Sequence, residues 1–145
     1  MNTATGTLVT YKMYIDGQWV NSASGQRFES HNPYTGKPWA LIPRGNAEDV
    51  DRAVRAARKA FTTGDWPKLT PSKRGALLRK LGDLIADQSK YLAEIEVRDN
   101  GKLLAEMSAQ TAYMAQWYYY YGGLADKIEG AVIPIDKPDT FNYTR

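Results

Sequence analysis

The sequence predicts a mixed α/β chain, with short strands near its start, helices through its middle and an extended segment at its end. β-prone runs joined by turn residues fill the first third, and helical spacing of apolar residues follows from Asn46. Residues 131–145 contain two prolines in an otherwise extended pattern. With 145 residues, 43% hydrophobic and 24% charged, the composition is that of one globular domain.

The strand region contains one strong turn signal. Residues 1–10 are polar and predict a flexible tail. The run KMYIDGQWV then places Asp16-Gly17 between two β-prone runs, and this pair predicts a two-residue hairpin because both positions accept a positive φ. RFESHN and PWALIPRG are further strand candidates, separated by the turn residues Asn32-Pro33.

The first two helices have recognisable ends. Asn46 is a good N-cap residue, and Gly64 follows the last apolar position of that pattern. Thr70-Pro71 predicts the start of a second helix, because threonine caps and proline suits the first turn.

Two more helical patterns follow. One begins at Asp87 or Ser89 and stops at Asn100-Gly101. The last runs from about Leu103 to Gly130 and is apolar or aromatic on more than one side, which is typical of a helix buried on several faces.

Composition excludes several kinds of function. The net charge is only +3, and the basic residues alternate with acidic ones rather than forming a cluster. We therefore expect no nucleic-acid partner. The absence of cysteine and the single histidine, His31, exclude thiolate metal sites and a multi-histidine zinc site within the chain. No apolar stretch suits a bilayer and no signal peptide is visible, so we expect no membrane association and a cytoplasmic location.

Most charged residues are predicted to lie on the solvated surface rather than to take part in catalysis or binding. Glu48, Asp49 and Asp51 stand beside arginines and are expected to form a solvated helix face. His31 is expected to be structural or exposed. Asp99, next to the helix-ending Asn-Gly, is most simply a helix-end residue.

The aromatic run QWYYYYGG is the feature with most functional promise, and three interpretations stand open: core, nucleic-acid stacking surface, or pocket lining. Core packing is favoured, because aromatic side chains bury large areas. Stacking would require a basic groove beside the rings. On a helical net the residues form two stripes, namely Ala109, Tyr113 and Trp117 with Tyr120 alongside, and Met107, Thr111, Met114, Tyr118 and Tyr121.

Eight motifs in order resemble the N-terminal region of the aldehyde dehydrogenase superfamily: YIDGQWV, NPYTGK, AEDVDRAVRAARKAF, DW, RGALLRKLGDLI, DNGK, YYYYGGLADKIEG and FNYTR. The resemblance implies an α/β parent fold and oxidation of an aldehyde with NAD or NADP through a cysteine thiohemiacetal and thioester. The family's catalytic Cys and Glu and its cofactor-binding residues match nothing here. We therefore expect this chain alone to be inactive.

The resemblance also implies roles within the chain. Residues 11–136 would belong to the cofactor-binding domain and residues 137–145 would begin an oligomerisation strand of a homo-oligomer, dimer or tetramer. Cut at Arg145, that strand would lack its hairpin partner. Tunnel-facing positions match Ala109, Tyr113 and Trp117, with Gln110 nearby, and predict a hydrophobic or aromatic aldehyde.

A monovalent cation site is also implied. It would use the Asp99 side chain with the backbone around Ser30 and His31, since carboxylate and carbonyl oxygens suit a hard cation.

A different function class stays open. The chain could be a stand-alone, non-enzymatic helical interaction module that has kept the family's N-terminal sequence. An RNA-binding helical domain is a third hypothesis.

Overall fold

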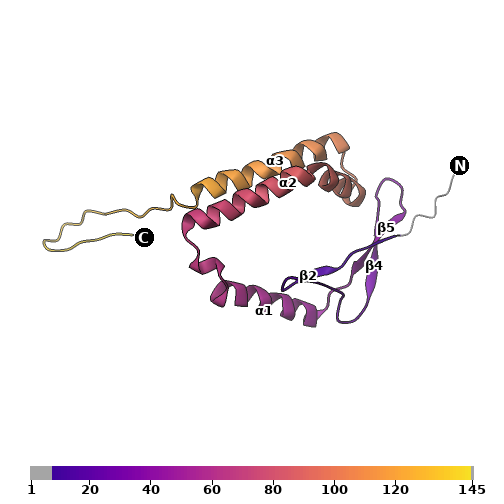
Figure 1. Cartoon of the computed structure of the whole chain (residues 1–145), viewed down its shortest axis with the longest axis horizontal. Helices are drawn as coiled ribbons and strands as arrows, with labels where there is room; N and C mark the ends of the chain where they lie inside the picture. Colours follow the sequence, from indigo (N-terminus) through magenta and orange to yellow (C-terminus); the bar gives the residue numbers. More distant parts are fainter. Residues whose placement is uncertain (1–7, 145) are drawn as a thin grey trace.

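The computed structural model describes residues 8–144, which form a strand region, a separate helix, a pair of long helices and an extended terminal segment (Figure 1). The predicted order of strands followed by helices is confirmed. In chain order the elements are β1 (Val9–Thr10), β2 (Met13–Ile15), β3 (Gln18–Val20), β4 (Arg27–His31), β5 (Pro38–Pro43), α1 (Ala47–Thr63), the 3-10 turn η1 (Trp66–Lys68), α2 (Pro71–Asn100) and α3 (Leu104–Leu124).

The predicted hairpin is confirmed. β2 and β3 pair antiparallel, with Met13 opposite Val20 and Ile15 opposite Gln18. The turn between them has positive φ angles at Asp16 (49°) and Gly17 (78°), as a primed two-residue turn requires.

A three-stranded sheet lies beside this hairpin in the order β1-β5-β4. β4 is antiparallel to β5, whereas β1 is parallel to it with Val9 opposite Ala40. The predicted flexible tail, residues 1–10, is therefore wrong for Val9 and Thr10, whose β-branched side chains suit a strand. Residues 1–7 lie outside the described part of the chain.

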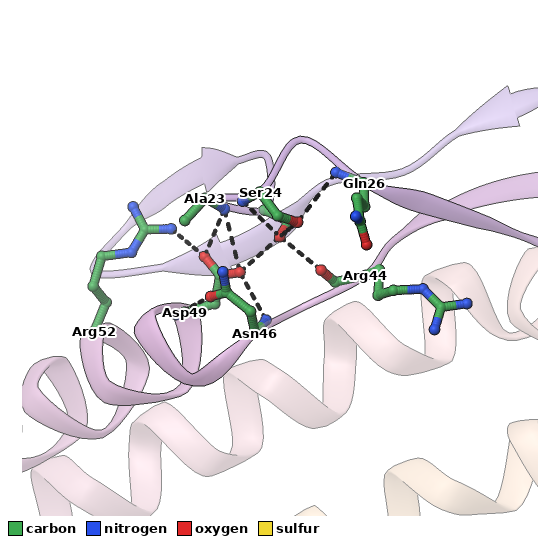
Figure 2. Close-up of polar contacts among 8 residues, drawn as sticks. Ala23, Ser24, Gln26, Arg44, Asn46, Asp49 and Arg52 are labelled. Carbon is green, nitrogen blue, oxygen red and sulfur yellow. Dashed lines mark hydrogen bonds and ion pairs between the residues drawn. The ribbon is translucent and has the colours of Figure 1, made fainter.

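Asp49 joins the strand region to α1 (Figure 2). Its side chain is only 2% exposed. It accepts hydrogen bonds from the Ser22 hydroxyl (2.8 Å), the Ala23 N–H (3.0 Å) and the Asn46 N–H (3.0 Å). Arg52 adds an ion pair at 2.5 Å. The expectation that Asp49 belongs to a solvated face is wrong, because the loop after β3 folds over the first turn of α1.

The same contacts form a capping box. The Asn46 side chain accepts from the Asp49 N–H at 3.1 Å while the Asp49 carboxylate accepts from the Asn46 N–H. Burial alone would raise the pKa of Asp49, but the hydrogen bonds from Asn46, Ser22 and Ala23 and the bond from Arg52 together hold that pKa well below its usual range. The cap predicted at Asn46 and the end predicted at Gly64 are both confirmed.

α2 is one helix of 30 residues rather than two. Thr70 caps it and Gly101 ends it with a left-handed φ of 75°, both as predicted. The new helix start predicted at Asp87 or Ser89 is wrong. The sequence between Pro71 and Asn100 contains no internal proline, and isolated capping residues inside a long apolar pattern do not stop a helix that is held by a partner.

α3 ends at Leu124, before the predicted Gly130. Gly122 and Gly123 weaken the helix at this end, since glycine disfavours helical backbone by about 1 kcal/mol relative to alanine.

No helix within residues 8–144 has the combined length and apolar character that crossing a bilayer requires.

α2 and α3 lie side by side and antiparallel (Figure 1). A Cβ placed on Gly75 would overlap the Gly122 carbonyl, and one placed on Gly122 would lie 2.9 Å from the Gly75 carbonyl oxygen. A Cβ on Gly82 would lie 2.6 Å from the Tyr119 ring. Gly122 therefore belongs to the close helix contact, whereas a Cβ added at Gly123 would have nothing within 4 Å.

Polar bonds fasten the same pair of helices. The Thr111 hydroxyl donates to the Ser89 carbonyl at 3.0 Å. At the other end, the Arg79 guanidinium donates to the Gly122 carbonyl at 3.2 Å, where the last turn of α3 leaves carbonyls without a partner of their own.

The terminal segment folds back on itself. Val132 and Tyr143 form an antiparallel bridge, flanked by bonds from Ile133 N to Asn142 O (3.0 Å) and from Thr144 N to Ala131 O (2.9 Å). The expectation that this strand lacks a hairpin partner is therefore wrong for residues 142–144, because residues 131–133 fill that role. Arg145 lies outside the described residues.

Gly75→Ala should destabilise the chain by about 1–3 kcal/mol, because the new methyl group overlaps the Gly122 carbonyl. Gly123→Ala is the matched control and should leave stability unchanged or raise it by up to about 1 kcal/mol. Urea unfolding followed by circular dichroism measures both. A Gly75→Ala chain as stable as the unchanged one would contradict the close contact.

Asp49→Asn should lower the urea midpoint, since an amide cannot accept the full set of hydrogen bonds or pair with Arg52. The folded pKa of Asp49 lies below its unfolded value of about 3.9, so its contribution is complete above that value and is lost as pH falls through the folded pKa. The unchanged chain and Asp49→Asn should therefore differ in free energy of unfolding by a constant amount from pH 7 to pH 5. This difference should shrink only below about pH 4.

The control for this comparison is Asp51→Asn, because Asp51 makes an exposed ion pair with Arg55 on the same helix and such pairs contribute little. Equal effects of the two substitutions would show that the buried network is not what stabilises this end of α1.

Candidate functional site

α3 presents an aromatic face away from α2. Tyr113 and Trp117 are 59% and 55% exposed. Their rings meet edge to face with centroids 5.9 Å apart, as residues four apart on one helix face can. This face therefore carries both large aromatic side chains that were predicted to line a tunnel.

A concave depression of about 510 Å³ lies along this face; we call it the α3 groove. Its lining consists of Ala109, Gln110, Tyr113, Met114 and Trp117. The structure therefore brings together all four residues that the family resemblance places at a tunnel. It adds Met114, which the helical net places on the other stripe.

The groove is suited to binding rather than to bond making. Gln110 supplies an amide, and the other walls are apolar or aromatic apart from the Tyr113 hydroxyl at its tip. Such a site can hold an apolar body and orient it through a few hydrogen bonds. The chain contains no cysteine, so no thiolate nucleophile is available here.

The core interpretation of the aromatic run is only partly correct. Met107 and Thr111 are buried as expected, at 4% and 2% exposure. Met114 and Tyr121 are 39% and 56% exposed, so their assignment to packing is wrong. The helix contact is built mainly from small residues, together with the Tyr119 ring against Gly82 and the buried Met107.

A hydrogen bond fixes the rotation of α3 against α2. The Tyr119 hydroxyl donates to Asp83 at 2.9 Å. This bond, with a smaller effect of burial, raises the pKa of Tyr119, so the phenol stays protonated at neutral pH. Because Tyr119 points to α2, Tyr120 and Trp117 are turned to the outer side.

The residues predicted for a cation site lie where β4 meets the end of α2. Ser30 donates a hydrogen bond to Asp99 at 2.5 Å, which links β4 to the end of α2. The His31 ring instead lies 3.4 Å from the Glu29 carboxylate. Within residues 8–144, no group of three or more His, Cys, Asp or Glu side chains could hold a metal ion. A site made from one carboxylate and backbone carbonyls stays a prediction.

A second hollow, between the β2–β3 hairpin and α1, is lined partly by Arg52, Arg55 and Lys59. Each of these cations has a carboxylate partner, respectively Asp49, Asp51 and Asp16. The charges balance locally, so this hollow offers no net attraction to an anion.

The N-terminus of α1 is not free to bind a pyrophosphate. A helix N-terminus after a strand is where a pyrophosphate commonly binds, and α1 follows β5 in this way. The Asp49 carboxylate and the Asn46 amide already occupy that end of α1. We therefore assign no cofactor contact to this end of α1.

Sequence reasoning missed two residues of importance. Asp49 could have been found from the capping-box spacing with Asn46, which places an acid at the third helical position. Met114 carried no such signal, because a methionine on an apolar helix is usually a core residue. Its outward position becomes clear only once α2 is known to pack against the small residues of α3.

Comparison with known proteins places these features in a family. The family model described as "Aldehyde dehydrogenase family" matches residues 19–145. The chain is 48% identical, over 89% of its own length and 26% of the relative's, to the (Z)-2-((N-methylformamido)methylene)-5-hydroxybutyrolactone dehydrogenase of Acinetobacter baylyi.

Solved structures agree. An aldehyde dehydrogenase from Bacillus cereus, in a mutant form, matches with a TM-score of 0.86 and 39% identity over 94% of this chain and 28% of that one. A betaine aldehyde dehydrogenase from Staphylococcus aureus, solved with NAD+, matches with a TM-score of 0.83 and 37% identity over 92% and 27%. The chain spans about a quarter of the length of the relatives it matches.

Proposed function

The chain belongs to the aldehyde dehydrogenase family, and we propose that it forms the N-terminal part of an enzyme that oxidises an aldehyde to a carboxylic acid with NAD or NADP. The cysteine that would carry the thiohemiacetal and thioester must lie in another part of such an enzyme, because this sequence has none. What this chain contributes is binding and orientation.

The α3 groove is the single observation that carries the proposal. Its walls are apolar and aromatic, and the Tyr113–Trp117 edge-to-face pair gives them a fixed shape. Such walls favour a hydrophobic or aromatic aldehyde and keep water from its apolar part. Gln110 supplies a donor and an acceptor that can orient a polar substituent.

The cofactor would be held outside this chain. The similar S. aureus betaine aldehyde dehydrogenase was solved with NAD+, which supports a nicotinamide dinucleotide for the parent enzyme. Use of NADP is part of the proposal. So is the small monovalent cation at Asp99 and the backbone around Ser30 and His31.

We also propose that the parent enzyme is a cytoplasmic homo-oligomer, a dimer or a tetramer. The support is the terminal hairpin of residues 131–144, which exposes Phe141 (73%) and Tyr143 (54%) on a segment that extends from the helices (Figure 1). Exposed aromatic residues on an incompletely paired hairpin favour pairing with another chain.

The isolated 145-residue chain should produce no NADH when it is incubated with NAD and a panel of aldehydes, because it has no nucleophilic cysteine. The complete enzyme is the positive control. Absorbance at the NADH band measures both. Steady NADH production by the isolated chain would contradict the proposal, and an inactive complete enzyme would favour the non-enzymatic interaction module instead.

Trp117→Ala in the complete enzyme should raise KM for bulky aromatic aldehydes by roughly tenfold, which corresponds to the loss of one large apolar contact. KM for propanal should change little, because a short aldehyde does not reach this ring. Trp66→Ala is the matched control, since Trp66 lies in η1 outside the groove. Unchanged KM values across small and bulky aldehydes would rule out a tunnel role for Trp117.

A further inference from the structure

A third hollow, of about 270 Å³, lies where α2 turns into α3. We call it the distal depression. The residues that matter for its chemistry are Leu92, Ile95, Glu96, Lys102, Gln110 and Met114. It is more enclosed by side chains than the α3 groove, because it has walls from both helices and from the turn between them.

The two depressions meet at a shared wall. Gln110 and Met114 line both of them and lie one turn apart on α3. Met114 is 39% exposed, and an unbranched thioether adapts its shape to what lies against it. A molecule lying along the α3 groove can therefore continue past Met114 into the distal depression.

The lining of the distal depression combines the apolar side chains of Leu92 and Ile95 with the polar side chains of Glu96, Lys102 and Gln110. Glu96 already accepts a hydrogen bond from Asn100 at 2.7 Å. The side chains of Lys102 and Gln110 make no hydrogen bond or ion pair with other residues in the range 8–144. Two donors are thus free to bind an acceptor, and the opposite charges of Glu96 and Lys102 leave the depression with no net charge to select an anion.

We propose that the distal depression binds the far end of an elongated aldehyde, and that this end carries an uncharged hydrogen-bond acceptor such as a hydroxyl, amide or ester oxygen. The apolar middle of the substrate lies in the α3 groove, Met114 separates the two parts, and Lys102 with Gln110 binds the acceptor. This inference rests on the proposed aldehyde oxidation and narrows its substrate class.

The test compares aldehydes of equal length in the complete enzyme. Octanal and ω-hydroxyoctanal differ only in the terminal hydroxyl, and propanal reports basal oxidation. One hydrogen bond in a partly enclosed site should make kcat/KM for ω-hydroxyoctanal about threefold to tenfold higher than for octanal. Lys102→Met should raise KM for ω-hydroxyoctanal, so that the ratio of its kcat/KM to that of octanal falls close to one. The kcat/KM for propanal should not change.

Two further variants separate binding from folding. Lys90→Met is the matched control, because Lys90 is exposed on α2 and lines neither depression; it should keep the ratio. Ile95→Phe narrows the distal depression without touching the α3 groove, and should lower kcat/KM for both eight-carbon aldehydes but not for propanal.

Each outcome decides something. If the unchanged enzyme oxidises propanal but prefers octanal or shows no preference, the inference is overturned and the proposed function stands. If no aldehyde is oxidised, the proposed function itself fails. If Lys102→Met loses propanal oxidation as well, the ratio in the unchanged enzyme and the effect of Ile95→Phe still decide the role of the distal depression.

Discussion

At the start of α2 and the end of α3, the backbones of Gly75 and Gly122 lie so close that neither position has room for a side chain. The other buried residues of the pair are mostly small as well, including Ala93 and Ala115. Small residues let the two helices approach closely, and Tyr119 lays its ring against the bare backbone of Gly82. Tyr113 and Trp117 are consequently placed on the outer side of α3, where they shape the α3 groove.

The position of the groove therefore depends on interactions that are remote from it. The Tyr119–Asp83 bond and the Thr111–Ser89 bond set the rotation and the register of α3. The buried Asp49 network has a separate role, because it fixes α1 to the strand region. Helix packing and the polar network act on different parts of the chain, so a change in one need not disturb the other.

Local signals are enough to predict much of this structure. Asp16-Gly17, Asn46, Thr70 and Gly101 each act on their own turn or helix end, and each is predicted correctly. The parallel pairing of β1 with β5 is missed because it joins segments about thirty residues apart. For the candidate site, the family resemblance supplies four lining residues. Met114 and the distal depression require knowledge of the packed pair, since they depend on where α2 lies.

A helix with a small inner face and an aromatic outer face forms, in our proposal, one wall of an aldehyde-binding tunnel. A crystal structure of the complete enzyme with an unreactive primary amide analogue of a long aldehyde tests this most directly. We expect the analogue to lie along the α3 groove in contact with Tyr113 and Trp117. A structure in which other parts of the protein cover both rings, and the analogue binds elsewhere, would contradict the proposal.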